Sequence, residues 1–171
     1  MLDGPIELAR PHRPRVSLVV TRQRMAPPGN LVRLDFPSHL DMLDVVQVLT
    51  DHVGQVSGLD DDATHWIGVA VRESVINAIK HGNGEDSAKR VTVEMRLEPR
   101  ANPSRLVVRV LDQGPGFDPD AVADPLAPEN LLRSSGRGIF FMRSFMDDIA
   151  LKRMPGGGME VRMVKNLSAE E

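Results

Sequence analysis

The sequence predicts an α+β fold, a two-layer α/β sandwich in which a mostly antiparallel mixed sheet carries helices on one face. Alternating apolar and polar residues indicate strands near residues 31–36, 91–98 and 106–111. Two helical segments, about 38–57 and 60–81, lie between the first and second of these strands. The full order is a strand, two helices, two strands, a long loop, a short helix and a final hairpin. This order favours a single sheet covered by helices.

The composition indicates one globular domain preceded by a basic arm. The chain has 171 residues, of which 41% are apolar and 26% are charged, as in ordinary soluble proteins. Residues 1–30 contain five arginines, five prolines and only two acidic residues. We expect this stretch to be a flexible arm with at most one short strand, near Val16–Thr21, and residues 31–171 to form the domain.

Several functional classes are disfavoured by what the sequence lacks. Without cysteine there is no disulfide framework, no thiolate zinc site and no cysteine nucleophile. No apolar run approaches the roughly eighteen residues of a membrane span, and the start of the chain does not resemble a secretory signal, so we expect a cytoplasmic protein without a membrane partner. The formal net charge of -3 argues against direct binding of nucleic acid.

The first strand and helix are expected around residues 31–56. Alternation over residues 31–36 indicates a half-buried strand that Pro37 ends. Ser38 suits the N-cap of the following helix, with Asp41 as a weaker form of the capping-box acid, and Gly58 closes that helix. The apolar side of the helix is expected to consist of Leu40, Leu43, Val48 and Val56.

The second helix and the later strands have clearer signals. Asp60, Asp61 and Asp62 suit the positive end of a helix that runs to about His81 and stops at Gly82. After it, the following features are expected: a strand with Val91, Val93, Met95 and Leu97 on one face; a partner strand over 106–111; an irregular stretch over 118–135 with three prolines; a short helix with Ile139, Met142, Phe145 and Met146 inward; and a hairpin over roughly 148–165, turning at 155–158.

Glu73 and Asn77 interrupt the second helix with polar side chains. They are four residues apart, so they lie nearly one above the other, and His81 continues the stripe. Apolar residues surround them almost all round the helix. Because burying an unpaired carboxylate is very costly, these groups either bond neighbouring backbone and loop groups or hold a ligand. The helix alone leaves both interpretations open.

Two glycine-containing segments suggest further ligand contacts. Asp112 shares strand parity with Leu106, Val108 and Val110, so it is aimed at the core side, and Gly114 and Gly116 after it allow close backbone approach. A plain turn with a capping aspartate explains this segment equally well. The second segment, 136–139, reads Gly136, Arg137, Gly138 and Ile139. It precedes the short helix, where backbone amides favour phosphate and Arg137 would add charge.

The three segments together resemble the GHKL ATPase superfamily, which has the Bergerat ATP-binding fold. Residues 73–81 resemble its N box, residues 112–117 its G1 box, and residues 136–139 its G2 box. Order, spacing and secondary-structure setting agree over roughly residues 31–167. The short first strand, the compact loop and the closing hairpin resemble the bacterial anti-sigma factor serine/threonine kinases. The family often has Gly-Thr in the last hairpin, where this chain has Gly158-Met159.

The resemblance implies a role for each motif position. Glu73 would be the general base, and Asn77 would hold the Mg²⁺ that bridges the phosphates of ATP. Lys80 and His81 would contact phosphate or order the loop over it, and Asp112 would accept a hydrogen bond from the adenine amino group. The remaining cofactor-binding positions implied by the motifs are Gly114, Gly116, Phe117, Gly136, Arg137, Gly138 and Ile139.

The function implied by the resemblance is that of an anti-sigma factor kinase. Such a protein phosphorylates a STAS-type anti-sigma-antagonist protein, sequesters a sigma factor, and forms a homodimer through its sheet region. A non-catalytic, ATP-gated binding module of the same fold remains the alternative, which Met159 at the usual threonine position favours. A sensor histidine kinase is disfavoured, because no phosphoacceptor histidine followed by acidic and basic residues precedes the N box.

Overall fold

The computed structural model describes residues 31–99, 102–116 and 142–167. Its elements are β1 (Leu31–Pro37), a 3₁₀ turn (Leu40–Met42), α1 (Leu43–Val56), α2 (Asp61–Asn77), a π-helical turn (Ala78–Gly82), β2 (Arg90–Glu98), β3 (Arg105–Leu111), β4 (Asp148–Arg153) and β5 (Met159–Asn166). Their order along the chain is the predicted one.

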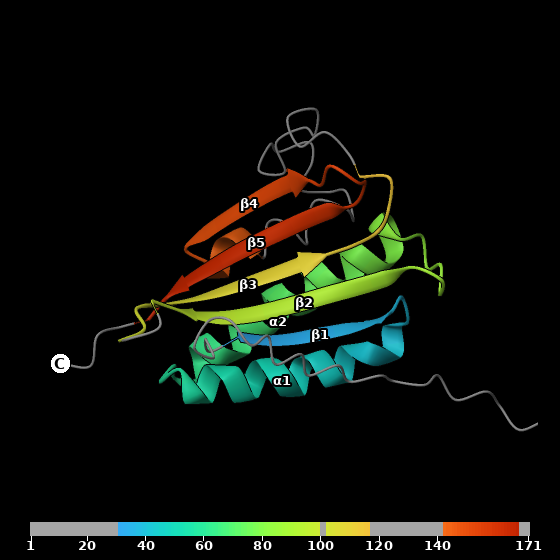
Figure 1. Ribbon diagram of the computed structural model, residues 1–171. Coiled ribbons are helices and arrows are strands. Elements are labelled where there is room, and N and C mark those ends of the chain that lie inside the picture. The colour runs from blue at the N-terminus through green and yellow to red at the C-terminus, as the bar shows by residue number, and fades with distance from the viewer. Residues whose placement is uncertain (1–30, 100–101, 117–141, 168–171) are drawn as a thin grey trace, which may run out of the picture.

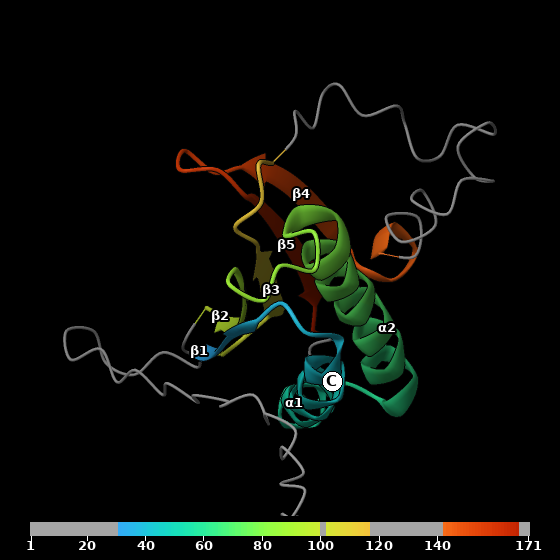
Figure 2. The same cartoon turned by 90° about the vertical axis from the view of Figure 1, so that its right-hand side faces the viewer.

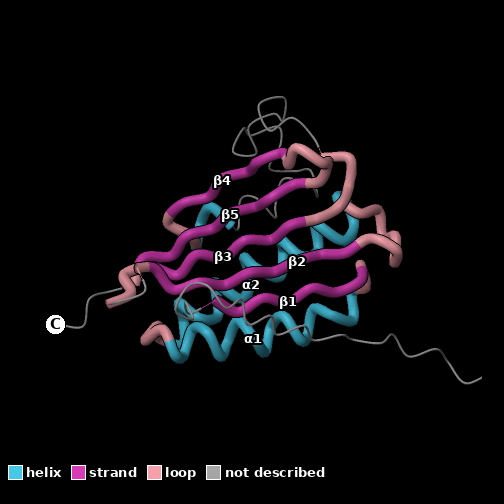
Figure 3. Tube along the Cα trace, in the orientation of Figure 1, coloured by secondary structure: helices cyan, strands magenta, loops and turns pink. Residues whose placement is uncertain are grey.

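The five described strands form one sheet in the order β1-β2-β3-β5-β4. Every pairing within it is antiparallel, with β3 at the centre between β2 and β5. Figures 1 and 3 show α2 behind the sheet and α1 along its β1 edge, and Figure 2 shows both helices on the same side of the sheet. The predicted two-layer sandwich is therefore confirmed, and the described strands include no parallel pair.

The core lies between the sheet and the two helices. Alternate residues of β2 and β3 are almost fully buried there, as their parity predicts. The helices contribute Leu43, Val46 and Val53 from α1 and Ile67, Val71 and Val75 from α2. Met142 and Met146 are also buried, and the half-buried Phe145 stacks on Trp66 with ring centroids 4.1 Å apart. The described part of the short helix therefore packs inward.

The start of α1 differs from its prediction. Ser38 does not cap the helix: its hydroxyl donates to the Lys89 carbonyl at 3.2 Å and accepts from the Asn83 amide at 2.6 Å. Asp41 takes part in no capping box, because a 3₁₀ turn comes first and α1 begins at Leu43 without a side-chain cap. The Ser38 hydroxyl thus bonds residues distant in the sequence instead of capping the helix as the local pattern had predicted.

The predicted apolar face of α1 was also wrong, apart from Leu43. Leu40, Val48 and Val56 are exposed by 40%, 70% and 61%. The buried face instead consists of Leu43, Val46, Thr50, Val53 and Gly54. The first four follow one another at intervals of three or four residues, and Gly54 lies four residues after Thr50, as a helical stripe requires. The predicted set included intervals of five and eight residues, which drift away from a single face.

α2 begins as predicted, and together with the π turn that follows it the helical segment also ends as predicted. The Asp60 carboxylate accepts a hydrogen bond from the Ala63 amide at 2.6 Å and caps the helix. The π turn carries the chain to Gly82, where the helix stops. The apolar residues around the helix are not buried on every side, however, because Trp66 is 41% exposed and Val69 is half-buried. Within the described residues, no helix combines the length and hydropathy needed to cross a membrane.

Candidate functional site

Asp112 lies where β3 leaves the sheet, fixed by the start of β5. Its amide donates to the Met159 carbonyl at 3.1 Å. Its Oδ1 accepts hydrogen bonds from the Gly114 amide at 2.8 Å and the Met159 amide at 3.2 Å. In the part of the chain that the structure describes, no hydrogen bond reaches Oδ2. One carboxylate oxygen is therefore held in place while the other remains available as an acceptor.

Burial raises the pKa of Asp112 above its ordinary value, and the two amide hydrogen bonds from Gly114 and Met159 only partly counteract this effect. Burial has this effect because a desolvated carboxylate is less stable in its charged form. Perturbed carboxylates of this kind are concentrated at functional sites. The position predicted from strand parity is therefore a candidate binding residue.

Three glycines from distant segments pack around Asp112, and we call this set, Gly82, Gly114 and Gly158, the glycine junction. A β-carbon added to Gly82 would lie 2.5 Å from Asp112 Cγ, and one added to Gly114 would lie 2.0 Å from the Gly82 carbonyl oxygen. At Gly158 the added carbon would lie 2.1 Å from the Asp112 carbonyl oxygen, and the φ angle is +85°. Gly114 and Gly158 therefore require glycine, because the added carbon would meet backbone, whereas a side chain at Gly82 would displace the Asp112 carboxylate.

The glycine junction changes the interpretation of two predicted residues. Gly114 was predicted to allow backbone approach to a ligand. In the structure, its lack of a side chain already serves another purpose, because it allows the loop to pack against Gly82. Gly82 was predicted only as a helix stop. Gly116 was predicted, with Gly114, to allow backbone approach to a ligand, and its φ of +68° gives it a conformational reason to be glycine as well. The end of α2, the loop after β3 and the β4–β5 turn therefore meet at a single point.

Glu73 and Asn77 lie on α2 with half-buried side chains. Among the described residues neither makes a hydrogen bond or an ion pair, so the predicted local bonding partners are not found there. The chain then passes through the π turn, where Lys80 and His81 are exposed. Turns of this type occur often at functional sites. In Figure 1 this end of α2 lies beside the loop that leaves β3.

Asn83 belongs to the site but was missed in the sequence. It is 2% exposed and bonds to three segments. Its Nδ2 donates to Ser38 Oγ at 2.6 Å and to the Arg90 carbonyl at 2.9 Å, and its Oδ1 accepts from the Gln113 amide at 2.7 Å. In the sequence it lies in a glycine-rich turn, where asparagine is common without any functional role, so no local signal indicated it.

The predicted residues Phe117, Gly136, Arg137, Gly138 and Ile139 lie outside the described residues. No group of three histidine, cysteine, aspartate or glutamate residues that could hold a metal ion occurs in the described ranges. A metal at Asn77 would therefore need most of its ligands from a bound molecule and from water.

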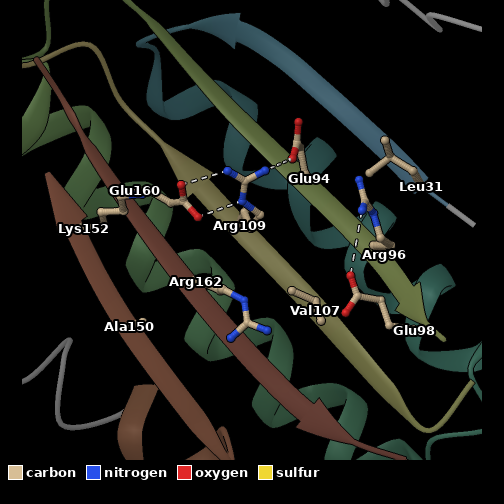
Figure 4. A pocket seen from close by; sticks show the side chains of 10 residues that line it. All are labelled: Leu31, Glu94, Arg96, Glu98, Val107, Arg109, Ala150, Lys152, Glu160 and Arg162. Atoms are coloured by element: carbon tan, nitrogen blue, oxygen red, sulfur yellow. Dashed lines mark hydrogen bonds and ion pairs between the residues drawn. The ribbon is translucent and has the colours of Figure 1, made fainter. Parts of the chain in front are cut away.

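A charged hollow lies on the face of the sheet opposite the described helices. Its volume is about 420 Å³, and Figure 4 shows the side chains that line it. At its centre Arg109 donates two hydrogen bonds to Glu160, both 2.8 Å long, and one of 2.8 Å to Glu94. Successive residues of a strand point to opposite faces of the sheet. Arg109 points into this hollow, whereas Asp112, three positions later, points to the face that the helices cover. The hollow is therefore separated from Asp112 by the sheet. It is not part of the glycine junction.

Comparisons with known proteins show the family to which this chain belongs. Residues 36–165 match the family described as the histidine kinase-like ATPase domain. The anti-sigma F factor of Bacillus subtilis is 32% identical over 120 residues, which cover 68% of this chain and 77% of that protein. The serine-protein kinase RsbW of Listeria monocytogenes is 25% identical over 154 residues, 86% of this chain and 94% of that protein. RsbW of Staphylococcus epidermidis is 25% identical over 146 residues, 82% and 89% of the two chains.

Proposed function

Because this chain belongs to the histidine kinase-like ATPase family, and within it to the bacterial anti-sigma factor kinases, we propose that it is a serine/threonine protein kinase that uses ATP and Mg²⁺. Its substrate would be a hydroxyl group of a STAS-type anti-sigma-antagonist protein, and it would sequester a sigma factor. The observation that carries the proposal is the fixed Asp112 carboxylate beside the end of the helix that bears Glu73 and Asn77.

The adenine end of the site is supported by the geometry of Asp112. An exocyclic amino group is a hydrogen-bond donor, and Asp112 Oδ2 is an acceptor without a partner among the described residues. A hydrogen bond to a charged acceptor in a partly desolvated place is stronger than one in water. Guanine offers a carbonyl oxygen at the corresponding position, so this carboxylate would favour adenine.

The phosphate end would be formed by α2 and the π turn. Asn77 would contribute an amide oxygen to Mg²⁺, and the phosphates and water would supply the other ligands, which is the usual arrangement for this ion. Bound magnesium would neutralise charge on the phosphate oxygens. Lys80 and His81, exposed on the π turn, would contact phosphate or order the loop, and the 136–139 motif would add backbone amides.

Glu73 would act as the general base. Its carboxylate would accept the hydroxyl proton while that oxygen forms a bond to the γ-phosphorus, and the bond from the γ-phosphorus to the bridging oxygen breaks to release ADP. The half-buried side chain has no partner in the described residues that would compete for this proton. The role still requires a substrate hydroxyl to reach it from outside the helix.

Two further parts of the proposal concern assembly and location. We propose a homodimer that pairs through the sheet, whose face opposite the described helices carries the charged hollow around Arg109. Sedimentation of the wild-type protein and of Arg109→Glu tests this, because reversing the central charge should shift a dimer to monomer if that face is the interface. We also propose a cytoplasmic location, with neither nucleic acid nor membrane as a direct partner.

Titration calorimetry with ATP, with and without Mg²⁺, tests the nucleotide site. We expect magnesium-dependent binding that is lost in both Asn77→Ala and Asp112→Ala. Wild-type protein that does not bind ATP would overturn the proposal and leave a nucleotide-independent partner-binding domain.

The alternative is a binding module that ATP switches without phosphoryl transfer. Met159 favours it, because this residue offers the site backbone groups but no hydroxyl. Glu73→Gln separates the two functions. A kinase should lose transfer of labelled phosphate to its antagonist and retain ATP binding, whereas a binding module should control its partner as the wild type does.

A further inference from the structure

We propose that Asn83 is a positioning residue for adenine recognition, because it fixes the loop that carries Asp112 to the end of α2. The inference rests on the proposed function, since it takes Asp112 as the acceptor for the adenine amino group. It assigns a role to a residue outside the three sequence motifs. Asn83 lies immediately after the π turn and Gly82, at the point where the helix and the loop meet.

The hydrogen-bonding capacity of the Asn83 side chain is almost completely used. Both Nδ2 hydrogens have acceptors, Ser38 Oγ and the Arg90 carbonyl, and Oδ1 accepts from the Gln113 amide. The side chain is 2% exposed, so water cannot readily replace these partners. The residue also donates its own amide to the Ala78 carbonyl at 2.8 Å, which closes the π turn. Hydrogen bonds of both the side chain and the backbone therefore hold Asn83 in place.

Asn83, Arg90 and Gln113 form a closed ring of three hydrogen bonds. Asn83 donates to the Arg90 carbonyl at 2.9 Å, and the Arg90 amide donates to Gln113 Oε1 at 2.8 Å. The Gln113 amide completes the ring by donating to Asn83 Oδ1 at 2.7 Å. Gln113 directly follows Asp112, so its backbone and its side chain are both held. Asp112 therefore cannot shift without straining two hydrogen bonds of its neighbour.

The ring and the glycine junction act on the same loop from one side. Gly82 packs against Asp112 and Gly114, and Asn83, the next residue, bonds Gln113 between them. This contact joins segments 30 residues apart in the sequence. Its consequence is a fixed relation between the end of the helix that bears Glu73 and Asn77 and the carboxylate that selects the base.

Asn83→Ala and Ser38→Ala are a matched pair of variants for testing the role. Both residues are 2% exposed and belong to the same network, so both changes disturb a buried polar group. Only Asn83→Ala removes the acceptor of the Gln113 amide. Gln113→Ala is a third variant, which removes the acceptor of the Arg90 amide at an exposed position and should fold even where Asn83→Ala does not.

Amide hydrogen exchange provides the first measurement and needs no nucleotide. We expect the Gln113 amide to exchange at least about tenfold faster in Asn83→Ala than in the wild type, and to be unchanged in Ser38→Ala. In Gln113→Ala, the Arg90 amide should lose its protection. Unchanged exchange in these variants would overturn the inference that the ring holds the loop.

The second measurement is the ratio of ATP affinity to GTP affinity, determined by calorimetry. We expect this ratio to fall about five- to tenfold in Asn83→Ala and about two- to threefold in Gln113→Ala, with no change in Ser38→Ala. An equal fall of the affinity ratio in Ser38→Ala, or an unchanged ratio in folded Asn83→Ala, would show that Asn83 has only a structural role. Wild-type protein that binds neither nucleotide would overturn the proposed function and the adenine role, while exchange would still decide the anchoring of the loop.

Discussion

Alanine at Gly158 is the perturbation that most directly tests how the β4–β5 turn holds Asp112. The added β-carbon would lie 2.1 Å from the Asp112 carbonyl oxygen and 3.0 Å from its carbonyl carbon. The φ angle of +85° is also strained for any residue with a side chain. Both effects act on the residue whose carboxylate we assign to adenine, so the change should affect stability and binding together.

The magnitude follows from these two effects. Overpacking against backbone costs about 1–3 kcal/mol, and a left-handed φ costs an alanine about 1–2 kcal/mol. The sum of about 2–5 kcal/mol corresponds to a melting temperature lower by about 4–20 °C in a domain of this size. It is a large share of the roughly 5–15 kcal/mol that holds a typical domain folded. If Asp112 moves, ATP affinity should fall about tenfold, the equivalent of one hydrogen bond.

Gly156→Ala is the matched control, because it lies in the same turn and its added carbon meets no atom within 4 Å. Thermal unfolding followed by circular dichroism and ATP titration by calorimetry should leave this control within about 0.5 kcal/mol of the wild type. If Gly158→Ala also melts and binds like the wild type, the close approach of the turn to Asp112 is wrong. If it melts early but binds ATP normally, the turn stabilises the fold without placing the carboxylate.

Two pH-dependent predictions, for Asp112 and Glu160, and one kinetic prediction, for Glu73, follow from the site and the charged hollow. Burial raises the pKa of Asp112, so this group favours the folded state most below its unfolded pKa, and the advantage is lost as pH rises through the folded pKa. Asp112→Asn should therefore melt higher than the wild type at pH 7, with the difference vanishing near pH 3, and should bind ATP more weakly; a lower melting temperature at pH 7 would contradict this. The hydrogen bond from Arg109 lowers the pKa of Glu160, so its stabilisation is present above the unfolded pKa and lost as pH falls through the folded pKa. Glu160→Gln should cost about 1.5 kcal/mol at pH 7 in urea unfolding, the low end for charged hydrogen bonds because Arg109 is partly exposed, and nothing at pH 2–3; a cost that does not change with pH would refute this. Glu73→Gln should reduce phosphoryl transfer by at least about a hundredfold with ATP affinity within about threefold of the wild type, as measured by labelled phosphate and calorimetry; retained transfer would remove Glu73 as the base.

Local pattern was sufficient for much of the fold and part of the site. The alternation in β2 and β3 predicted which residues face the core, and hence that Asp112 is aimed at that side. Asp60 was predicted as a helix start and caps α2. These predictions depend on residues within a few positions of one another, which is the range over which periodicity and capping act. Phe117 and the 136–139 motif remain predictions, because they lie outside the described residues.

Only the tertiary structure decided which distant groups meet. Ser38 has the local pattern of a helix cap, but its hydroxyl instead accepts a hydrogen bond from the buried Asn83, 45 residues away in the sequence. The exposed valines of α1 resemble core residues until the sheet fixes which stripe is covered.

The sequence by itself determined the order of elements, the polar stripe of Glu73 and Asn77, and the glycine loop after Asp112. The tertiary structure added the glycine junction and the ring around Asn83, where the end of α2, the loop after β3 and the β4–β5 turn come together. The physical reason is that hydrogen-bond partners and close backbone contacts between distant segments leave no periodic trace in either segment, whereas helix faces, strand parity and caps do.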